Sequence, residues 1–196
     1  MIEFEDLLVN YTWKLQLDRI NYSLNAMNIT YRPLNINDAA SYRKLRLKAL
    51  REAPTAFTSS YEEQKDQKIE FFQNLVDGTP RNFINGAFDE SRLVGTLGFY
   101  QEPHDKRSHL GTIVGMFVDE AYRGNDIAQT LLKMVINRAK QLADLQHLLI
   151  EVSTQALPAL HIYEQAGFSP WGREPGAIKV GQELIDTYHM ILSLSN

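Results

Sequence analysis

The chain has 196 residues, of which 44% are hydrophobic and 22% are charged, with a formal net charge of -4 and no cysteine. This balance predicts one well-filled domain, and the lack of thiols excludes disulfides, a thiolate nucleophile and cysteine-based metal sites. The acidic charge argues against nucleic-acid binding, and without a membrane-spanning apolar run or a signal-peptide pattern we expect no membrane association and a cytoplasmic protein.

Residues 1–28 are rich in leucine and aromatic side chains, and we expect an N-terminal extension to a single domain over residues 29–196. The first half of the extension has apolar residues at helical spacing, which favours a helix, whereas Trp13, Leu15 and Leu17 alternate as in a strand. The helix would have two apolar sides, which predicts packing on the domain or on a second copy in a homodimer. The alternative is a loosely held terminus.

The domain opens with a predicted strand at residues 29–32 and a predicted helix over residues 38–52. Asn35 or Asn37 can cap this helix, and Pro54 ends it.

Ser59 or Ser60 caps a second predicted helix, which places Phe71, Phe72 and Leu75 on one face. A strand pair joined by a polar turn then follows. Its two predicted strands span residues 83–88 and 93–100.

The second half of the domain alternates strands and helices. Predicted strands cover residues 110–118, 148–152, 168–171 and 187–194, and predicted helices cover residues 127–142 and 156–166, the latter closed by Gly167. The strand–helix–strand run from residue 110 to residue 152 requires a crossover, which predicts parallel neighbours. We therefore expect an α/β fold with a central mixed β-sheet flanked by helices on both faces.

A short polar loop joins the strand that ends at Val118 to the helix that follows. Backbone N–H groups at a helix N-terminus lack partners within the helix, and the helix dipole adds positive potential there. The junction therefore predicts a site for a phosphate or pyrophosphate. A Rossmann-type nucleotide-binding fold is a weaker interpretation, because no Gly-x-Gly-x-x-Gly follows the first strand.

Residues 118–132, followed by Tyr-Glu-Gln-Ala-Gly-Phe at residues 163–168, resemble the GNAT superfamily of acetyl-CoA-dependent N-acetyltransferases. The likeness runs over about residues 29–194. It implies the GNAT-like acyl-CoA N-acyltransferase fold, with acetyl-CoA as the cosubstrate.

The resemblance also implies which residues hold acetyl-CoA. The strand before the loop would bond the pantetheine arm through its backbone, and the loop amides would hold the pyrophosphate. The implied cofactor-binding residues are Met116, Phe117, Val118, Arg123, Gly124, Asn125, Asp126, Ile127, Ala128 and Thr130.

Asp126 stands where the family's loop usually has glycine, although Arg123 and Ala128 match the ends of the motif. A carboxylate beside a diphosphate is repulsive and a Cβ restricts positive φ, which predicts weakened binding. Aspartate nevertheless tolerates left-handed geometry, and its side chain can face solvent or bond the first helical turn.

By the same resemblance, Tyr163 protonates the departing CoA thiolate, and a phenol and a thiolate have similar basicity. The alternative for Tyr163 is a core aromatic residue with one hydrogen bond. The family often has asparagine seven residues earlier, where this chain has Ala156; Gln155 or Thr154 can replace that polar contact.

Attack by an amine also requires a base, and Glu151 is the candidate because it is the single glutamate of an apolar strand. Burial would raise its pKa toward a useful range. Alternatively Glu151 faces solvent or pairs with a lysine, and a bound water takes the proton. The histidines lack metal-site spacing, so we expect no metal.

Residues 54–60 resemble the acceptor-cleft segment of one subset of the family. Phe57 would then form an apolar wall, and Ser59 and Ser60 would contact the substrate, unless the serines act only as helix caps. Tyr188 and His189 can border the same cleft.

The resemblance implies an N-acetyltransferase that acts on a primary amine of a small molecule or peptide by direct transfer in a ternary complex. The strand N–H near Val118 would polarise the thioester carbonyl. The alternative, favoured by Asp126 and Ala156, is a CoA-binding regulatory protein with weak or lost catalysis.

Overall fold

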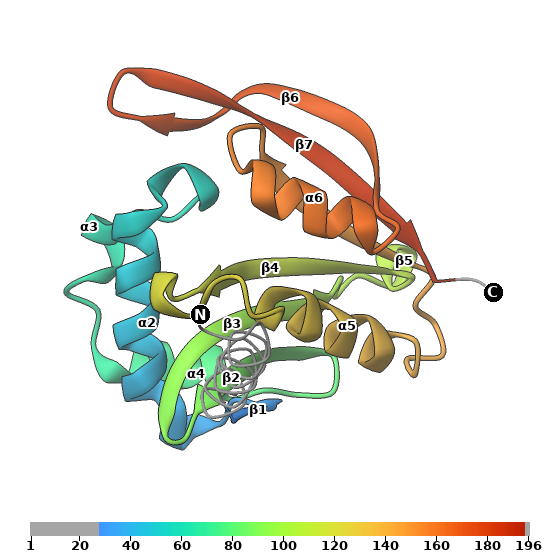
Figure 1. The fold of residues 1–196 in the computed structure, drawn as a ribbon. Coiled ribbons are helices and arrows are strands. Elements are labelled where there is room, and N and C mark those ends of the chain that lie inside the picture. The colour runs from blue at the N-terminus through green and yellow to red at the C-terminus, as the bar shows by residue number, and fades with distance from the viewer. Residues whose placement is uncertain (1–27, 195–196) are drawn as a thin grey trace, which may run out of the picture.

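The structure is a computed structural model that describes residues 28–194 (Figure 1). The extension predicted for residues 1–28 lies outside the described residues, apart from Asn28.

One mixed sheet of seven strands runs through the domain in the order β1-β2-β3-β4-β5-β7-β6. Neighbouring strands are antiparallel except β4 and β5, which are parallel as the crossover predicted. The strands are β1 (Ile29–Pro33), β2 (Asn82–Asp89), β3 (Arg92–Gln101), β4 (Leu110–Val118), β5 (His147–Ser153), β6 (Ser169–Val180) and β7 (Glu183–Ser193).

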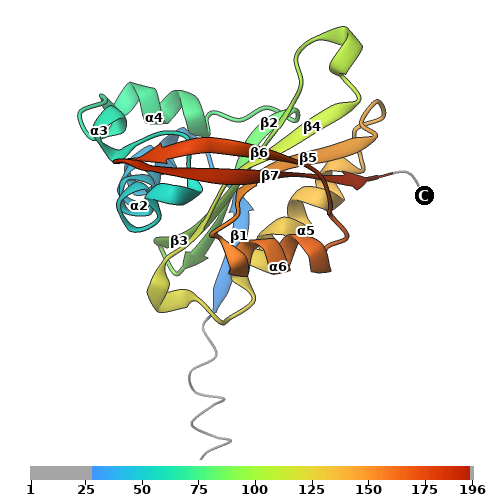
Figure 2. The same cartoon turned by 90° about the horizontal axis from the view of Figure 1, so that it is seen from above.

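Two groups of helices lie on opposite sides of this sheet (Figure 2). The first group is α2 (Ala39–Glu52), α3 (Tyr61–Gln64) and α4 (Ile69–Val76), and the second is α5 (Ile127–Ala139) and α6 (Leu157–Gln165). The predicted α/β fold with a central mixed sheet flanked by helices is therefore confirmed.

Helical periodicity explains how α5 packs on the sheet. Leu131, Val135 and Ala139 recur every four residues and are fully buried, in one core with Leu97 of β3 and Leu148 of β5. Each large apolar side chain buried in this way stabilises the fold by about 1.5–3 kcal/mol. The other face of the sheet has a second core under α2 and α4, which includes Leu45, Phe72 and Phe117.

β4 contains a bulge that reverses its faces. Its register with β3 shifts between Thr96 and Gly98, and Gly115 in the bulged segment has φ of 66°, which glycine adopts without steric cost. Residues four apart in a regular strand share a face, yet Ile113 lies in the core under α5 and Phe117 in the core under α2. The bulge therefore redirects the end of β4 just before the predicted phosphate loop.

β4 also separates from its parallel neighbour. The two strands pair only between residues 110–112 of β4 and residues 147–149 of β5. Beyond these three positions β4 and β5 diverge, which leaves an opening within the sheet.

The helix predicted after Ser60 is two short helices, because α3 ends at Gln64 and α4 begins only at Ile69. The buried side chains of α4 are Phe72 and Val76, and the predicted apolar face is wrong at Leu75, which is 38% exposed.

The last two strands are longer than predicted and form one long hairpin. β6 accommodates Gly172, Pro175 and Gly176 at two register shifts against β7, with Gly176 at φ of 62°. The predicted strand at residues 168–171 is thus only the start of β6.

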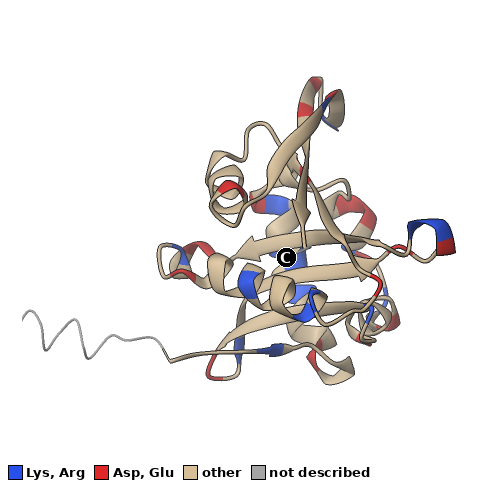
Figure 3. Cartoon of the chain, turned by 90° about the vertical axis from the view of Figure 1, so that its right-hand side faces the viewer, with Lys and Arg blue, Asp and Glu red and all other residues tan. Residues whose placement is uncertain are grey.

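Charged residues of both signs are interspersed over the described elements (Figure 3). This mixture is typical of an ordinary solvated protein surface. Among the helices of residues 28–194, none has both the length and the apolar character required to cross a membrane.

Candidate active site

A pocket of ≈ 370 Å³ opens where β4 leads into α5, and α6 forms its opposite wall. Eight of the predicted cofactor-binding residues line it: Met116, Phe117, Val118, Arg123, Gly124, Asp126, Ile127 and Ala128. The structure therefore brings the strand end and the loop to one cleft.

Val118 directs toward this cleft backbone groups that do not pair with β3. The N–H of Asp119 donates to the carbonyl of Val94 on β3 at 2.8 Å, and Val118 is paired with Gly95. Because bonded and non-bonded pairs alternate along antiparallel strands, Val118 directs its N–H and C=O away from β3. Arg123 Nε donates to this carbonyl at 3.2 Å, and the N–H points toward the gap between β4 and β5.

Six consecutive N–H groups of the loop and the first turn of α5, from Gly124 to Gln129, donate to no acceptor within residues 28–194. The first amide of this run with a partner is that of Thr130, which bonds the carbonyl of Asp126 at 2.9 Å. Gly124 has φ of 79° and no atom within 4 Å of the position that a Cβ would take, so the backbone is open to close approach. Free amides, an open backbone and the positive end of the α5 dipole form an anion site that fits a diphosphate.

Asp126 adopts the left-handed conformation, with φ of 55° and ψ of 18°. Its side chain is exposed and makes no capping hydrogen bond to α5. Of the two interpretations, the tolerated left-handed backbone is present and the bond to the first helical turn is not. The unpaired carboxylate lines the same pocket as the free amides.

Asn125 and Thr130 hold the loop in shape and do not line this pocket. Asn125 Nδ2 donates to the carbonyls of Tyr122 and Arg123 at 3.1 and 3.2 Å. The hydroxyl of Thr130 donates to the carbonyl of Asp126 at 2.9 Å. Their side chains therefore stabilise the turn that exposes the amides.

Tyr163 is 3% exposed, and its hydroxyl donates to Met116 Sδ on β4 at 3.5 Å. Burial raises the pKa of Tyr163 well above the ordinary 10.0, so the phenol stays protonated at neutral pH. The residue packs in the core edge-on to Phe168, and it also lines a pocket of ≈ 60 Å³ between β4 and β5. The core packing and single hydrogen bond of the alternative interpretation are present, and the role of Tyr163 as proton donor stays a prediction.

Ala156 is the N-cap residue of α6 and lines both pockets, at the position where the family often has asparagine. Neither predicted substitute, Gln155 or Thr154, lines either pocket. Gln155 Nε2 donates to Glu183 Oε1 at 2.6 Å on the β6–β7 turn, and the backbone N–H of Thr154 donates to the carbonyl of Asp186.

Glu151 lines the ≈ 60 Å³ pocket together with Tyr163, but its side chain is 59% exposed, so the burial considered for it is not present. Its partner is a histidine and not a lysine: His189 Nδ1 lies 3.7 Å from Glu151 Oε1. His189 Nε2 lies 3.0 Å from Glu174 Oε2 on β6. Sequence reasoning missed Glu174, because only the long β6 brings it beside His189.

The acceptor-side segment 54–60 faces a further pocket, of ≈ 350 Å³, that β6 closes. Phe57, Ser59 and Ser60 all line it, and Phe57 also lines the pocket that contains Glu151 and Tyr163. Ser60 in addition caps α3, because its hydroxyl accepts from the N–H of Glu63 at 3.2 Å. The predicted acceptor wall thus adjoins the predicted catalytic residues.

Metal-binding geometry is not found in the described part of the chain, where no three His, Asp or Glu side chains gather closely enough to hold an ion. His109 and His147 lie near each other, with ring centroids 6.4 Å apart.

Comparison with known proteins agrees with this geometry. The sequence pattern of the Acetyltransferase (GNAT) family matches residues 47–168. The Bacillus subtilis (strain 168) protein YwnH, which carries the name of a phosphinothricin acetyltransferase, is 24% identical over 122 residues, or 62% of this chain and 72% of YwnH.

Solved structures share the fold. An acetyltransferase of the GNAT family from Streptococcus pneumoniae superposes with a TM-score of 0.72 at 20% identity, over 86% of this chain and 100% of the other. The acetyltransferase yncA from Salmonella typhimurium, solved with its cofactor acetyl-CoA, has a TM-score of 0.74 at 15% identity, over 86% and 95% of the two chains.

Proposed function

The chain belongs to the Acetyltransferase (GNAT) family, and from this membership we propose that it transfers an acetyl group from acetyl-CoA to a primary amine within a ternary complex. The observation that carries the proposal is the run of free N–H groups from Gly124 to Gln129 beside the open edge of β4. A diphosphate offers this run several charge-assisted hydrogen bonds.

The open edge of β4 suits the other part of the cosubstrate. An extended pantetheine arm carries amide groups that can pair with a free strand edge. The N–H of Val118 is directed into the gap, where it would donate to the thioester oxygen as negative charge develops on it.

The proposed reaction is a direct attack. The amine nitrogen bonds the thioester carbonyl carbon, the C–S bond breaks, and the phenol of Tyr163 donates its proton to the departing sulfur. Glu151, or a water beside it, takes the proton that the acceptor nitrogen releases. Tyr163 and Glu151 line the same small pocket, which supports a shared reaction centre.

The proposed acceptor is a small molecule or a peptide that presents a primary amine. It would enter past Phe57, Ser59 and Ser60, which line the neighbouring pocket. Glu151 lines the adjoining pocket, and its carboxylate favours an acceptor that arrives as an ammonium over one with a second anionic group.

An assay of CoA release tests the proposal. The protein is mixed with acetyl-CoA and a panel of amines, amino acids and short peptides, and free thiol is measured beside calorimetric binding of acetyl-CoA. We expect micromolar-range or tighter binding and acceptor-dependent thiol release. A protein that binds ATP or NAD and not CoA contradicts the proposal.

A CoA-binding regulatory role is the second candidate, and two observations favour it. The Asp126 carboxylate lines the pocket proposed for acetyl-CoA. Ala156, at the N-cap of α6, provides no polar side chain to the same pocket. Acetyl-CoA binding without thiol release on any amine of the panel would support this candidate over the first.

A further inference from the structure

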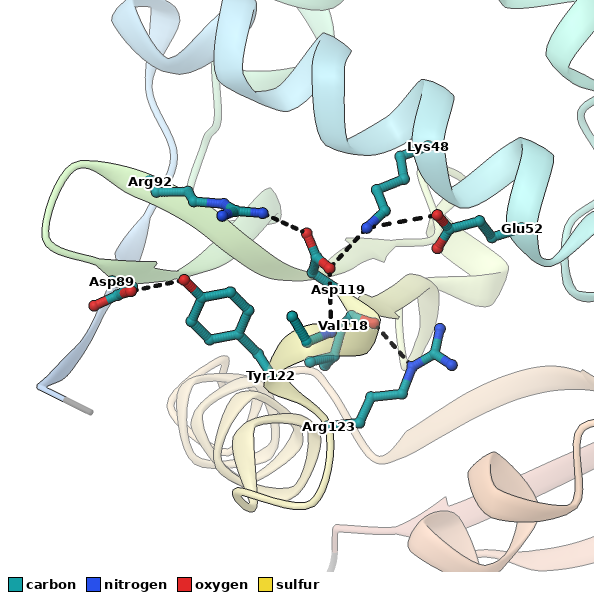
Figure 4. Close-up of polar contacts among 9 residues, drawn as sticks. Lys48, Glu52, Asp89, Arg92, Val118, Asp119, Tyr122 and Arg123 are labelled. Atoms are coloured by element: carbon teal, nitrogen blue, oxygen red, sulfur yellow. Dashed lines mark hydrogen bonds and ion pairs between the residues drawn. The ribbon is translucent and has the colours of Figure 1, made fainter. Parts of the chain in front are cut away.

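A buried carboxylate lies immediately before the loop with the free amides. Asp119 follows the last residue of β4 and is 3% exposed. Its Oδ1 accepts from Lys48 Nζ at 2.7 Å and from the backbone N–H of Ala121 at 3.3 Å, and its Oδ2 accepts from Arg92 Nη2 at 3.0 Å (Figure 4).

These contacts join three elements at one point. Lys48 comes from α2 and Arg92 from the start of β3, while the N–H of Ala121 belongs to the 3₁₀ turn between β4 and α5. Burial by itself would raise the pKa of Asp119, but the hydrogen bonds from Lys48 and Ala121 outweigh it and hold the pKa below the ordinary value. Asp119 is thus ionised at neutral pH and anchored on both sides.

Further bonds fix the same turn from its other end. The hydroxyl of Tyr122 donates to Asp89 Oδ2 at 2.7 Å, and the guanidinium of Arg92 lies 5.4 Å from the centre of the Tyr122 ring (Figure 4). The free amides begin at Gly124, two residues later. These contacts therefore anchor the turn that lies directly upstream of the anion site.

We propose that Lys48, Asp119 and Arg92 are positioning residues that set the orientation of the pyrophosphate loop before acetyl-CoA binds. An ion pair between Lys48 and the buried Asp119 carboxylate connects α2 to the turn and restricts where the loop can begin, so the amides point into the cleft without rearrangement. This inference rests on the proposed function of the loop, because acetyl-CoA is the ligand that the amides would bind.

The test compares Asp119→Asn with Asp38→Asn. Asp38 forms a matched ion pair at the opposite end of α2, where its oxygens accept from Arg32 at 2.6 and 2.8 Å, and it contacts no residue of the loop. Calorimetry with CoA, hydrogen exchange of amides 120–129 in the ligand-free protein and thermal unfolding are measured on both variants.

We expect Asp119→Asn to weaken CoA binding about tenfold and to accelerate exchange of the loop amides, because misplacement of a binding group by about 1 Å has costs of that order or more. The KM for acetyl-CoA should rise more than kcat falls. Asp38→Asn should lower the unfolding temperature while leaving CoA affinity within about twofold of the native protein, since its pair is remote from the loop.

A conservative pair of variants separates positioning from general destabilisation. Lys48→Arg keeps a cationic donor and should retain native exchange and affinity, whereas Lys48→Met should behave like Asp119→Asn. If Asp119→Asn does not fold, Arg92→Gln removes one contact from a side chain that is 61% exposed. Unchanged loop exchange in both Lys48→Met and Arg92→Gln overturns the positioning role, whereas failure of the native protein to bind CoA overturns the proposed function.

Discussion

The proposed chemistry depends most on a phenol that is buried beside an open strand edge. Tyr163 has one hydrogen-bond partner, a thioether on β4, and its raised pKa keeps the proton on the oxygen. The same burial disfavours an alkyl thiolate released next to the phenol, which makes the thiolate a better proton acceptor there than it is in water.

Replacement of Tyr163 by phenylalanine should separate catalysis from folding. Tyr163→Phe keeps the ring and its burial and removes only the hydroxyl, so we expect kcat to fall about a hundredfold or more while the affinity for acetyl-CoA changes little. Steady-state kinetics and calorimetry measure the two effects. An unchanged kcat across the accessible pH range would assign Tyr163 to the core alone.

Asp126 offers a second residue test, because charge and backbone geometry can be separated there. Asp126→Asn removes the charge and tolerates the left-handed backbone, and Asp126→Gly removes both restrictions. If the carboxylate repels the diphosphate, both variants should bind acetyl-CoA about three- to tenfold more tightly, as two like charges several ångströms apart in a solvated site imply. Equal affinity of the native protein and both variants, by calorimetry, contradicts the repulsion.

At the scale of elements, the segment formed by β4, the loop and α5 combines three local features of the backbone. The bulge at Gly115 turns the strand, the free edge at Val118 faces the gap, and the loop ends in open amides. Gly124 is the position where this geometry leaves no side chain between the backbone and a ligand.

Gly124→Ala should show whether that openness serves binding. Gly181, in the β6–β7 turn, is a matched control, because it has φ of 61° and likewise no atom within 4 Å of a Cβ. Both alanine variants should lose about 1 kcal/mol of unfolding free energy through the left-handed strain. Only Gly124→Ala should also weaken acetyl-CoA binding, and equal affinities in the two variants would show that the loop backbone does not approach the ligand.

Most elements could be predicted from the sequence because their signals are local. Capping residues and helical periodicity indicated the helices, and the crossover indicated that β4 and β5 are parallel. The unpaired amides of the loop could be predicted because the first N–H groups of any helix lack partners within it. The single helix predicted after Ser60 was wrong because one apolar pattern spans two helices. The predicted strand at residues 168–171 was too short because Gly172 and Gly176 also suit a bulged strand.

The distant parts of the site could not be predicted in this way. Lys48 and Asp119 are 71 positions apart, and nothing in either local pattern connects them. His189 meets Glu151 and Glu174 only through the pairing of β5, β7 and β6. The sequence therefore predicts contacts that depend on local backbone geometry better than contacts between residues that are distant along the chain.

At the scale of the whole molecule, three ionised aspartates connect different elements of secondary structure. Arg32 holds the pKa of Asp38 below its ordinary value, and hydrogen bonds from the Gly176 N–H and from Arg173 do the same for Asp186. Asp119 forms the third junction, between α2, β3 and β4. Together they connect the two ends of α2 to β1 and to the end of β4, and the bulged part of β6 to β7.

These pKa directions predict acid sensitivity. A carboxyl whose pKa is lower folded than unfolded contributes stability that is fully present above the unfolded value, about 3.9, and that disappears as the pH falls through the folded value. Urea unfolding of the native protein and Asp38→Asn should therefore show a stability deficit of the variant at pH 7 that shrinks toward pH 3. A deficit of equal size at both pH values would exclude an electrostatic origin.

The early separation of β4 from β5 has a further consequence for the ligand-free protein. β4 and β5 stop pairing after three positions, which leaves unpaired strand edges at the opening between them, and accessible unpaired edges are templates for strand exchange and aggregation. A cosubstrate arm that pairs with β4 would act as a removable strand and close one of these edges. On the proposed function, the concentration of acetyl-CoA would then affect the rate of aggregation of the protein as well as its rate of turnover.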